Sequence, residues 1–376
     1  MLYKDAIKLH KKLQGKISVS GKAAINSARD LSLLYTPGVG AVSTLLAKHP
    51  GLSRDYTIKH NSVAVISDGS AVLGLGNIGP EGALPVLEGK CLIFKKFAGV
   101  NAWPIALATQ DTEMIISIIK AIAPVFGGIN LEDISAPRCF EIERRLEREL
   151  SIPVMHDDQH GTAVVVLAAL VNAAKVVGKK FETLRVVISG AGPAGTATVY
   201  ILREAGIRHI VVLDSKGIVN ARRHDLAPYK QLLAKKTNPQ KISGGFEEAL
   251  RGADVFIGVS RGGLLSRDHI KIMATDSIVF ALANPVPEIM PEEARAGGAL
   301  VVATGRSDYP NQINNALVFP GVFRGALDHN VKRITLKIKI AAAMAIASLV
   351  KKPKQNHIIP SIFDKHLVKK VSSTIR

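Results

Sequence analysis

The chain has 376 residues, of which 47% are hydrophobic and 21% are charged. This balance is ordinary for a globular protein and excludes a disordered chain, and the length predicts two or three domains. Lys and Arg (49 residues) exceed Asp and Glu (31 residues) by 18. The excess is scattered in pairs, and aromatic residues make up only 5% of the chain. We therefore expect a surface that attracts anionic metabolites rather than specific nucleic-acid binding.

The chain lacks the usual signs of a membrane or secreted protein. No uninterrupted run of roughly 18 or more apolar residues occurs, so we expect no membrane-spanning helix. The first residues lack the apolar core of a signal peptide. Two cysteines, Cys91 and Cys139, are too few for a disulfide framework. Together these features predict a cytoplasmic protein.

The first half of the chain predicts an N-terminal α/β domain over residues 1–160. Strand-like runs occur at Val63–Ile66 and Cys91–Phe94. Helical patterns follow at Thr112–Ala123, with Asp111 as a candidate N-cap, and at Phe140–Leu150.

The second half alternates regularly between helices and strands. A long helix is predicted over Ala163–Val177, and a last helix over Lys337–Val350. Five strands are predicted between them: Val186–Ser189, Ile210–Leu213, Asp254–Val259, Ser277–Leu282 and Leu300–Ala303. Such alternation indicates a parallel, doubly wound sheet. We therefore expect a Rossmann-like domain over residues 161–376, with the last helix packing back on the first domain.

One glycine motif has the complete context of a dinucleotide-binding site. It comprises Gly190, Ala191, Gly192, Pro193, Ala194 and Gly195. It follows an apolar run, opens the potential helix Thr196–Glu204, and precedes Asp214, at the end of the next strand, by 24 positions. The glycines permit a tight turn, a close approach of the pyrophosphate and close helix packing, and Asp214 can accept hydrogen bonds from ribose hydroxyls. A plain strand–turn–helix is the alternative.

A second match to the same pattern, Gly74–Gly79, lacks this context. The residues that follow include Pro80, Gly82, Pro85 and Gly89, which argue against a helix of useful length. We predict a glycine-rich loop in the first domain, and the sequence does not distinguish it from a simple connecting turn.

Two acidic pairs follow chain breaks or apolar stretches. Glu132 and Asp133 come after a Gly-Gly break, and Asp157 and Asp158 come after a strand-like run. Converging carboxylates are the ligands that Mg²⁺ and Mn²⁺ prefer, and a cation relieves their mutual repulsion. Helix capping by the second pair, with Glu132 in solvent, fits the sequence equally well.

Two histidines near the second pair raise the question of zinc. His156 and His160 are four residues apart, but Gly161 and Thr162 indicate a loop that enters a helix. The two rings would then not share a helical face. We therefore expect capping or packing histidines rather than a zinc site.

Taken in chain order, these and other motifs resemble the malic enzymes of the short bacterial and archaeal type. The matching segments are Tyr35-Thr36-Pro37-Gly38-Val39, Ser67-Asp68-Gly69-Ser70-Ala71-Val72-Leu73 with the Gly74–Gly79 loop, Glu88-Gly89-Lys90, Asn130–Ile134, His156–Thr162, Gly190–Gly195, Asn284-Pro285, and Asn311–Asn315 leading into Phe319-Pro320-Gly321. The resemblance implies oxidative decarboxylation of L-malate to pyruvate and CO₂, with reduction of NAD or NADP and with Mg²⁺ or Mn²⁺. It also implies a homodimer or a higher homo-oligomer.

The resemblance implies roles for single residues as well. Lys90 corresponds to the general base at the C2 hydroxyl, and Tyr35 to the general acid that protonates C3 of the enolate. A base in this role needs a pKa well below the ordinary lysine value of about 10.4. Taken singly, these residues could equally be an exposed lysine and a packing aromatic.

The remaining implied roles concern ligands. The metal ligands are Glu132, Asp133 and Asp158, with Asp157 as their acidic neighbour. Asn284 and Asn315 correspond to malate-contacting asparagines, and Asn284 also borders the cofactor; both could instead be turn residues.

Some features depart from the family pattern or leave choices open. Ala71 stands where many members have an arginine that contacts malate, and Asn101 where an aspartate is more usual. Asp214 favours NAD, whereas Lys216 and the neighbouring Arg222 and Arg223 could offset it for NADP. Two rival functions remain: a 2-hydroxy-acid dehydrogenase that does not decarboxylate, and a non-catalytic nucleotide-sensing or nucleic-acid-binding protein on the same fold.

Overall fold

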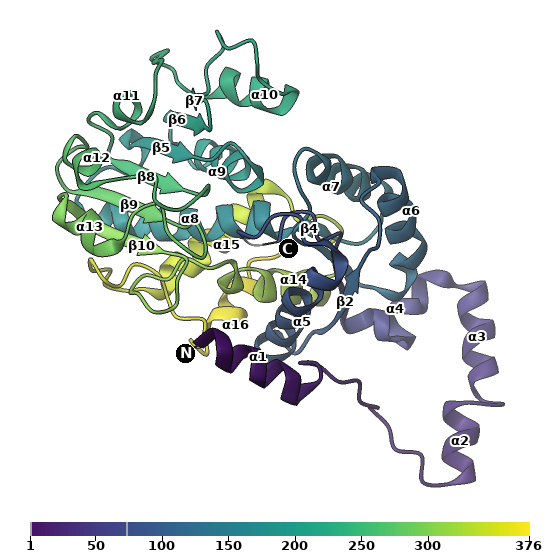
Figure 1. The fold of residues 1–376 in the computed structure, drawn as a ribbon. Helices are drawn as coiled ribbons and strands as arrows, with labels where there is room; N and C mark the ends of the chain where they lie inside the picture. Colours follow the sequence, from purple (N-terminus) through teal and green to yellow (C-terminus); the bar gives the residue numbers. More distant parts are fainter. Residues whose placement is uncertain (1, 73) are drawn as a thin grey trace.

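Two sheets organise the chain, as the computed structural model in Figure 1 shows. The structure describes residues 2–72 and 74–376, so Leu73 of the motif quoted above lies outside the described residues. The first sheet has the strand order β2-β1-β3-β4, and the second has the order β10-β9-β8-β5-β6-β7. All these neighbours pair in parallel, except that β7 runs antiparallel to β6. The predicted α/β class with a doubly wound, Rossmann-like sheet is confirmed.

The strands of the first sheet are β1 (Ser62–Ser67), β2 (Asn101–Ala106), β3 (Gly128–Leu131) and β4 (Val154–His156). Those of the second are β5 (Arg185–Ser189), β6 (His209–Asp214), β7 (Gly217–Ile218), β8 (Val255–Gly258), β9 (Ser277–Ala281) and β10 (Ala299–Thr304). The buried β-branched residues of β1, β5 and β8 explain why these strands could be located from the sequence. β2 was not predicted because it contains Pro104, which an edge strand tolerates.

The helices before the second sheet are α1 (Leu2–Leu13), α2 (Ala28–Leu34), α3 (Val39–Lys48), α4 (Ser53–Tyr56), α5 (Gly79–Ala98), α6 (Thr112–Ile122), α7 (Arg138–Glu149) and α8 (Asp157–Val176). Those that follow are α9 (Pro193–Glu204), α10 (Pro228–Lys236), α11 (Phe246–Leu250), α12 (Arg267–Lys271), α13 (Pro291–Ala296), α14 (Phe319–Asp328), α15 (Leu336–Leu349) and α16 (Leu367–Ser372).

Helix α5 overturns two predictions. The strand expected at Cys91–Phe94 lies inside this helix, and the prolines and glycines after Gly79 do not prevent it. Pro80 stands in the first turn, where the amide it lacks has no partner to lose, and Gly99 ends the helix in the left-handed conformation (φ 65°). Burial of an apolar face, with Leu87 and Phe94 fully inside, outweighs the cost of Pro85.

Helix α8 starts earlier than predicted. It begins at Asp157 rather than at residue 163, so Gly161 and Thr162 are helical and not part of an entering loop. His156 is the N-cap residue, and His160 lies in the first turn. Among residues 2–72 and 74–376, α8 is the one helix long and apolar enough to cross a membrane, and 72% of its apolar window is buried inside the protein.

One hydrophobic core joins the two halves of the chain. Phe94 of α5 packs against Phe319 and Phe323 of α14, with ring centroids 4.7 and 5.5 Å apart. Helix α15 packs along α8, and α16 packs on α14. The C-terminal helices return to the first domain: α14 contacts α5 and β3, and Lys339 of α15 lies near Glu143 of α7. Cys91 and Cys139 are buried and unpaired.

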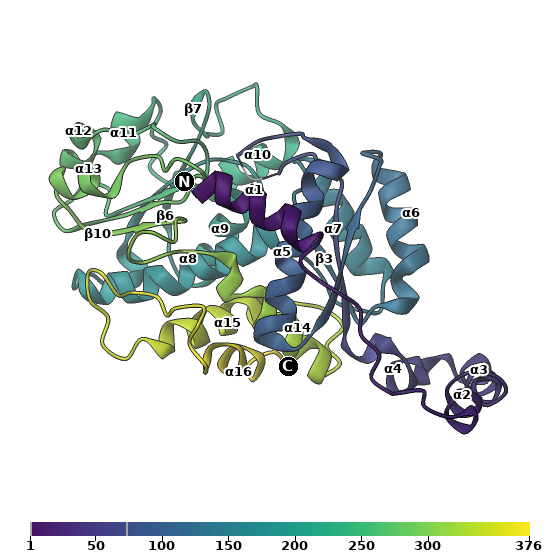
Figure 2. The same cartoon turned by 60° about the horizontal axis from the view of Figure 1, so that its bottom comes forward.

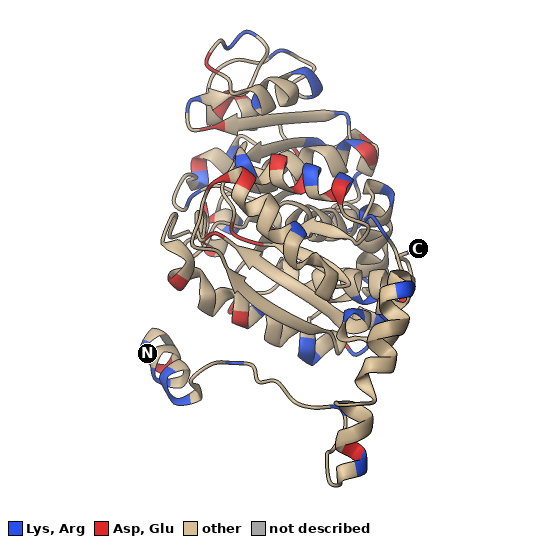
Figure 3. Cartoon of the chain, turned by 90° about the vertical axis from the view of Figure 1, so that its right-hand side faces the viewer, with Lys and Arg blue, Asp and Glu red and all other residues tan. Residues whose placement is uncertain are grey.

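The N-terminal helices α2 and α3 form an arm that stands away from both sheets (Figures 1 and 2). Both are fully described, and neither buries any residue. Leu33 and Leu34 of the arm are 64% and 49% exposed. In the ribbon of Figure 3, basic and acidic residues are interspersed along the elements of the body, and the basic ones form no continuous stripe in that view.

Candidate active site

The predicted acidic residues meet at the carboxyl edge of the first sheet. β3 ends one residue before Glu132, and β4 ends one residue before Asp157. Because these strands are parallel neighbours, with Leu131 opposite His156, the side chains that follow them share one edge. Glu132, Asp133 and Asp158 each offer a carboxylate oxygen, and these atoms lie within 4.8 Å of one another.

Lys90 reaches the same edge from α5. Its Nζ lies 2.6 Å from Glu132 Oε2 and also pairs with Asp157 Oδ2. The ring of Phe319 lies 4.8 Å from this nitrogen and covers it on another side. Lys90 is only 7% exposed although lysine is seldom buried, so its position is unusual enough to require a function.

The charges at this edge do not balance. Burial by itself lowers the pKa of Lys90, but Asp157, Glu132 and Asp158 raise it above the ordinary value. Burial and the neighbouring Asp158 raise the pKa of Glu132 well above its usual range. Lys90 therefore contacts two carboxyl groups and feels a third, and the neutral amine that a general base needs is not favoured by these groups alone.

A divalent cation fits this site. The donors are the hard oxygen ligands that Mg²⁺ and Mn²⁺ prefer. Asp157 Oδ1 and Asn130 Oδ1 are buried without a hydrogen-bond partner among the described residues, so the site holds polar atoms that its own side chains do not satisfy. Asp158 is oriented by the Asp133 backbone N–H, which donates to its Oδ2 at 2.7 Å.

A buried glutamate that the sequence analysis missed braces the turn from β4 into α8. Glu143 of α7 accepts from the His156 backbone N–H at 2.7 Å and from Gln159 Nε2 at 3.0 Å. His160 Nε2 lies 3.0 Å from the same carboxylate. Burial raises the pKa of Glu143, but His160 and the buried Lys339 outweigh it and lower that pKa to about 2. One signal was available, because Glu143 interrupts the apolar face of α7.

Replacing Glu143 with alanine should destabilise the protein and weaken cation binding at Asp158. The turn would lose hydrogen bonds to a charged acceptor, each worth about 1.5–3 kcal/mol. Glu143→Gln keeps an oxygen acceptor, so this variant should lose less stability and less cation affinity than Glu143→Ala. Urea unfolding and Mn²⁺ titration check this, with the exposed Glu141→Ala on the same helix as control. Equal unfolding midpoints for Glu143→Ala and the control would contradict the bracing role.

The two predicted asparagines lie on different loops, and Asn315 is the one beside the cluster. Asn315 begins the 3₁₀ turn Asn315–Leu317, and a Cβ added at Gly161 would lie 3.0 Å from its Cβ and within contact of Asp157. Asn284 follows β9, and its carbonyl oxygen approaches Gly74 so closely that a Cβ there would lie 2.1 Å away. The second glycine motif thus touches the loop of the second sheet that carries Asn284.

Ser70 and Ala71, after β1, support the backbone of the segment that carries Asp133. Ser70 Oγ accepts from the Ser135 backbone N–H at 2.9 Å, and the Ala71 backbone N–H donates to the Asp133 carbonyl at 2.9 Å. Asn101 lies elsewhere: it pairs with Ser62 at the amino end of β1 and accepts from Lys95 Nζ. The substitution at residue 101 therefore does not remove an acid from this edge.

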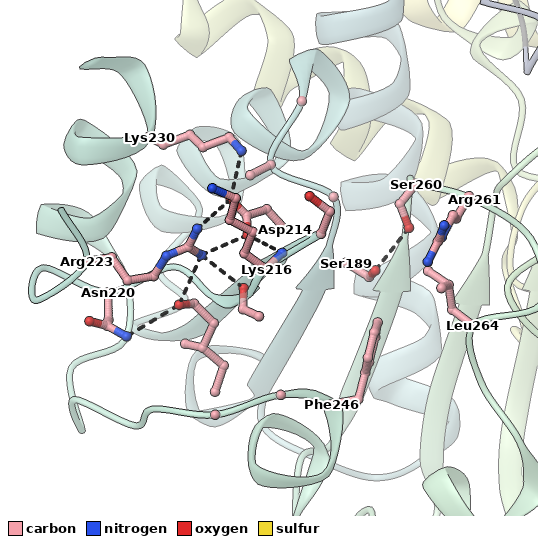
Figure 4. Close-up of a pocket in the computed structure, with 18 of the residues that line it drawn as sticks. Ser189, Asp214, Lys216, Asn220, Arg223, Lys230, Phe246, Ser260, Arg261 and Leu264 are labelled. Carbon is pink, nitrogen blue, oxygen red and sulfur yellow. Dashed lines mark hydrogen bonds and ion pairs between the residues drawn. The ribbon is translucent and has the colours of Figure 1, made fainter. Parts of the chain in front are cut away.

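The predicted dinucleotide motif lines a separate cavity of about 870 Å³ at the carboxyl edge of the second sheet. Gly190, with φ 117°, makes the turn after β5, and a Cβ at Gly195 would lie 1.8 Å from the Gly190 carbonyl oxygen. α9 starts at Pro193, so its N-terminus faces this cavity. Figure 4 shows Asp214, Arg223 and Lys230 gathered at one end, with Ser189, Ser260 and Arg261 across from them.

Tyr35 is not brought to these groups within one chain. It caps the C-terminal end of α2 on the exposed arm and is itself 64% exposed. Figures 1 and 2 both place α2 well away from α5, which carries Lys90.

Comparison with known proteins covers the whole chain. Residues 159–375 match the family model described as "Malic enzyme, NAD binding domain", and residues 14–113 and 108–147 match "Malic enzyme, N-terminal domain". An "NAD-dependent malic enzyme" of Geobacillus stearothermophilus is 55% identical over 96% of this chain and 76% of that protein. An "NADP-dependent malic enzyme" of Halomonas elongata is 44% identical over 97% of this chain and 90% of that protein. The crystal structure of an NAD-dependent malic enzyme from Thermotoga maritima superposes with a TM-score of 0.96, at 50% identity over 98% of each chain.

Proposed function

Because this chain belongs to the malic enzyme family, we propose that it oxidises and decarboxylates L-malate to pyruvate and CO₂ while reducing NAD or NADP. The observation that carries this proposal is the buried Lys90 amine among the carboxylates of Glu132 and Asp157, beside a cluster suited to a divalent cation. The family models meet between residues 147 and 159, which supports a division into residues 1–160 and 161–376.

Lys90 is the proposed general base. It would take the proton of the C2 hydroxyl, and for this its amine must be neutral. Glu132, Asp133 and Asp158 would hold the cation, which would offset the charge of Glu132 and Asp158, two of the three carboxylates that raise the pKa of Lys90. A dinucleotide held at the Gly190–Gly195 turn would supply a hydride acceptor, and a cation held by these three carboxylates would supply the Lewis acid that favours loss of CO₂.

The other side chains would position the substrate. Asn315, beside Asp157, and Asn284, on the facing loop, can donate to malate carboxylates from opposite sides. Asp157 keeps Lys90 in place through their ion pair. The ring of Phe319 covers one side of the amine, whose burial by itself lowers the pKa of Lys90.

Tyr35 is the proposed general acid at C3, supplied by the arm of a second copy of this chain. The arm is apolar and unburied in a single chain, and burial of Leu33 and Leu34 against a partner would stabilise a dimer. In such a dimer each site would combine Lys90 of one subunit with Tyr35 of the other.

Mixing two inactive variants should restore activity if the sites are shared. Tyr35→Phe removes the acid and Lys90→Met removes the base, so each homodimer is inactive. When the two are unfolded and refolded together, half of the dimers are mixed and each has one complete site, giving about a quarter of wild-type activity. No recovery, with mixed dimers demonstrated by mass spectrometry, would show that Tyr35 acts within its own chain, and an active Tyr35→Phe homodimer would exclude Tyr35 as the acid.

A malate assay tests the proposed reaction. Wild-type protein with Mn²⁺ should release CO₂ and form reduced dinucleotide in equal amounts, and chelation should stop both. Reduced dinucleotide without CO₂ would identify a non-decarboxylating dehydrogenase. If the protein forms neither CO₂ nor reduced dinucleotide and binds DNA or RNA in a salt-sensitive way, the non-catalytic rival function is favoured.

A further inference from the structure

The end of the dinucleotide cavity where β6 stops carries an ion-pair network rather than a free carboxylate (Figure 4). Asp214 Oδ1 accepts from Arg223 Nη1 at 2.7 Å, and Oδ2 accepts from Lys230 Nζ at 2.7 Å. The Lys216 backbone N–H also donates to Oδ1, at 3.0 Å. The charge of Asp214 is therefore compensated, and both of its oxygens are occupied.

Arg223 is held in place independently of Asp214. Its Nε and Nη2 donate to Asp225 at 3.0 and 2.9 Å, and Lys216 Nζ lies 2.9 Å from the same carboxylate. Three cations thus face two carboxylates in this network. If the Asp214 side chain turned away, Asp225 would still hold the Arg223 guanidinium. The part of the network that faces the cavity would then carry more positive charge.

An acidic side chain at this strand end ordinarily binds the ribose hydroxyls of NAD and repels the 2′-phosphate of NADP. Here the repulsion is offset by two cations that line the cavity themselves. Lys230 is the more adaptable of the two, because its ammonium sits on a flexible stem that is 22% exposed and can exchange Asp214 for another anion.

We propose that this network lets the cavity accept NADP as well as NAD, with Lys230 and Arg223 binding the 2′-phosphate. The inference rests on the proposed dinucleotide site. Family membership leaves the choice open, because relatives named for NAD and for NADP both match this chain.

Binding is measured directly by calorimetry with NAD and with NADP, without malate, so that no turnover contributes. We expect the two Kd values of the wild-type protein to agree within about tenfold, a difference of at most ~1.4 kcal/mol. Lys230→Gln should weaken the binding of NADP by roughly tenfold and the binding of NAD by less than about twofold, because only NADP carries the 2′-phosphate. Lys235→Gln, an exposed charge on the same helix α10, is the matched control and should change neither.

A second variant tests the role of the carboxylate. Asp214→Asn frees both cations, so it should tighten NADP severalfold relative to NAD, and added salt should reduce this gain. Wild-type discrimination against NADP by more than about 100-fold, or an equal effect of Lys230→Gln on both dinucleotides, would overturn the inference. Either result with normal NAD binding leaves the proposed reaction intact, whereas loss of NAD binding by the wild type would overturn the dinucleotide site as well.

Discussion

Lys90→Arg should lower kcat for malate oxidation by roughly 10²–10⁴-fold while the protein stays folded. Arginine keeps a cation between Glu132 and Asp157, so the ion pairs that surround the native amine are preserved in kind. A guanidinium does not lose its proton at neutral pH, so it cannot act as a base. The variant therefore separates the charge of Lys90 from its proposed chemistry.

Absorbance of the reduced dinucleotide measures this loss, and circular dichroism checks the fold. Lys96→Arg, an exposed lysine on the same helix, is the matched control and should leave kcat unchanged. Lys90→Met should also lose activity, but it should be less stable by roughly 3–5 kcal/mol, because it leaves buried carboxylates without their cation. A folded Lys90→Arg protein with more than about a tenth of wild-type kcat would exclude Lys90 as the base.

Compared with the wild type, the Asp158→Asn variant should be more stable in the absence of a divalent cation and less stable in its presence. Without one, the variant should melt at a higher temperature than the wild type, because one of the repelling carboxylates is gone. With Mn²⁺, the wild type should gain stability and the variant should gain little, since ligand binding stabilises only the state that binds. Its Mn²⁺ affinity should fall roughly 100-fold or more, beyond the 10–100-fold typical of changes outside the ligand shell.

Thermal unfolding and Mn²⁺ titration together check this reversal. Asp268→Asn removes a carboxylate whose side chain is 85% exposed, far along the chain in α12, and should shift neither quantity. A wild type that Mn²⁺ does not stabilise, or a variant that binds Mn²⁺ as tightly as the wild type, would contradict the assignment of Asp158 as a ligand.

The sequence was most informative where the structure of a segment depends only on its own residues and their neighbours along the chain. The second sheet follows from apolar runs that alternate with helical segments, and the turn at Gly190 follows from a motif whose neighbours all agree. The acidic pairs stood out because each follows a chain break or an apolar stretch, but the parallel pairing of β3 with β4 that brings them together was not predicted. Their closeness to Lys90 depends on α5, which the local signals at Pro80 and Pro85 argued against.

The rest depends on contacts between distant segments. Phe319 covers Lys90 from more than 200 residues along the chain, and Glu143 and Lys230 act through partners that the sequence does not identify. The exposed position of Tyr35 could not be foreseen either, because a motif gives a residue type and its neighbours but not the direction in which its segment leaves the fold.

The core that joins α5 to α14 also has a consequence for synthesis on the ribosome. Phe94 emerges early, but the rings that cover it, Phe319 and Phe323, belong to a helix made more than 200 residues later. Until then the first sheet has an uncovered apolar helix face, which is the kind of surface that attracts chaperones or aggregates. The nascent amino-terminal half should therefore depend on such protection until the carboxyl-terminal helices arrive.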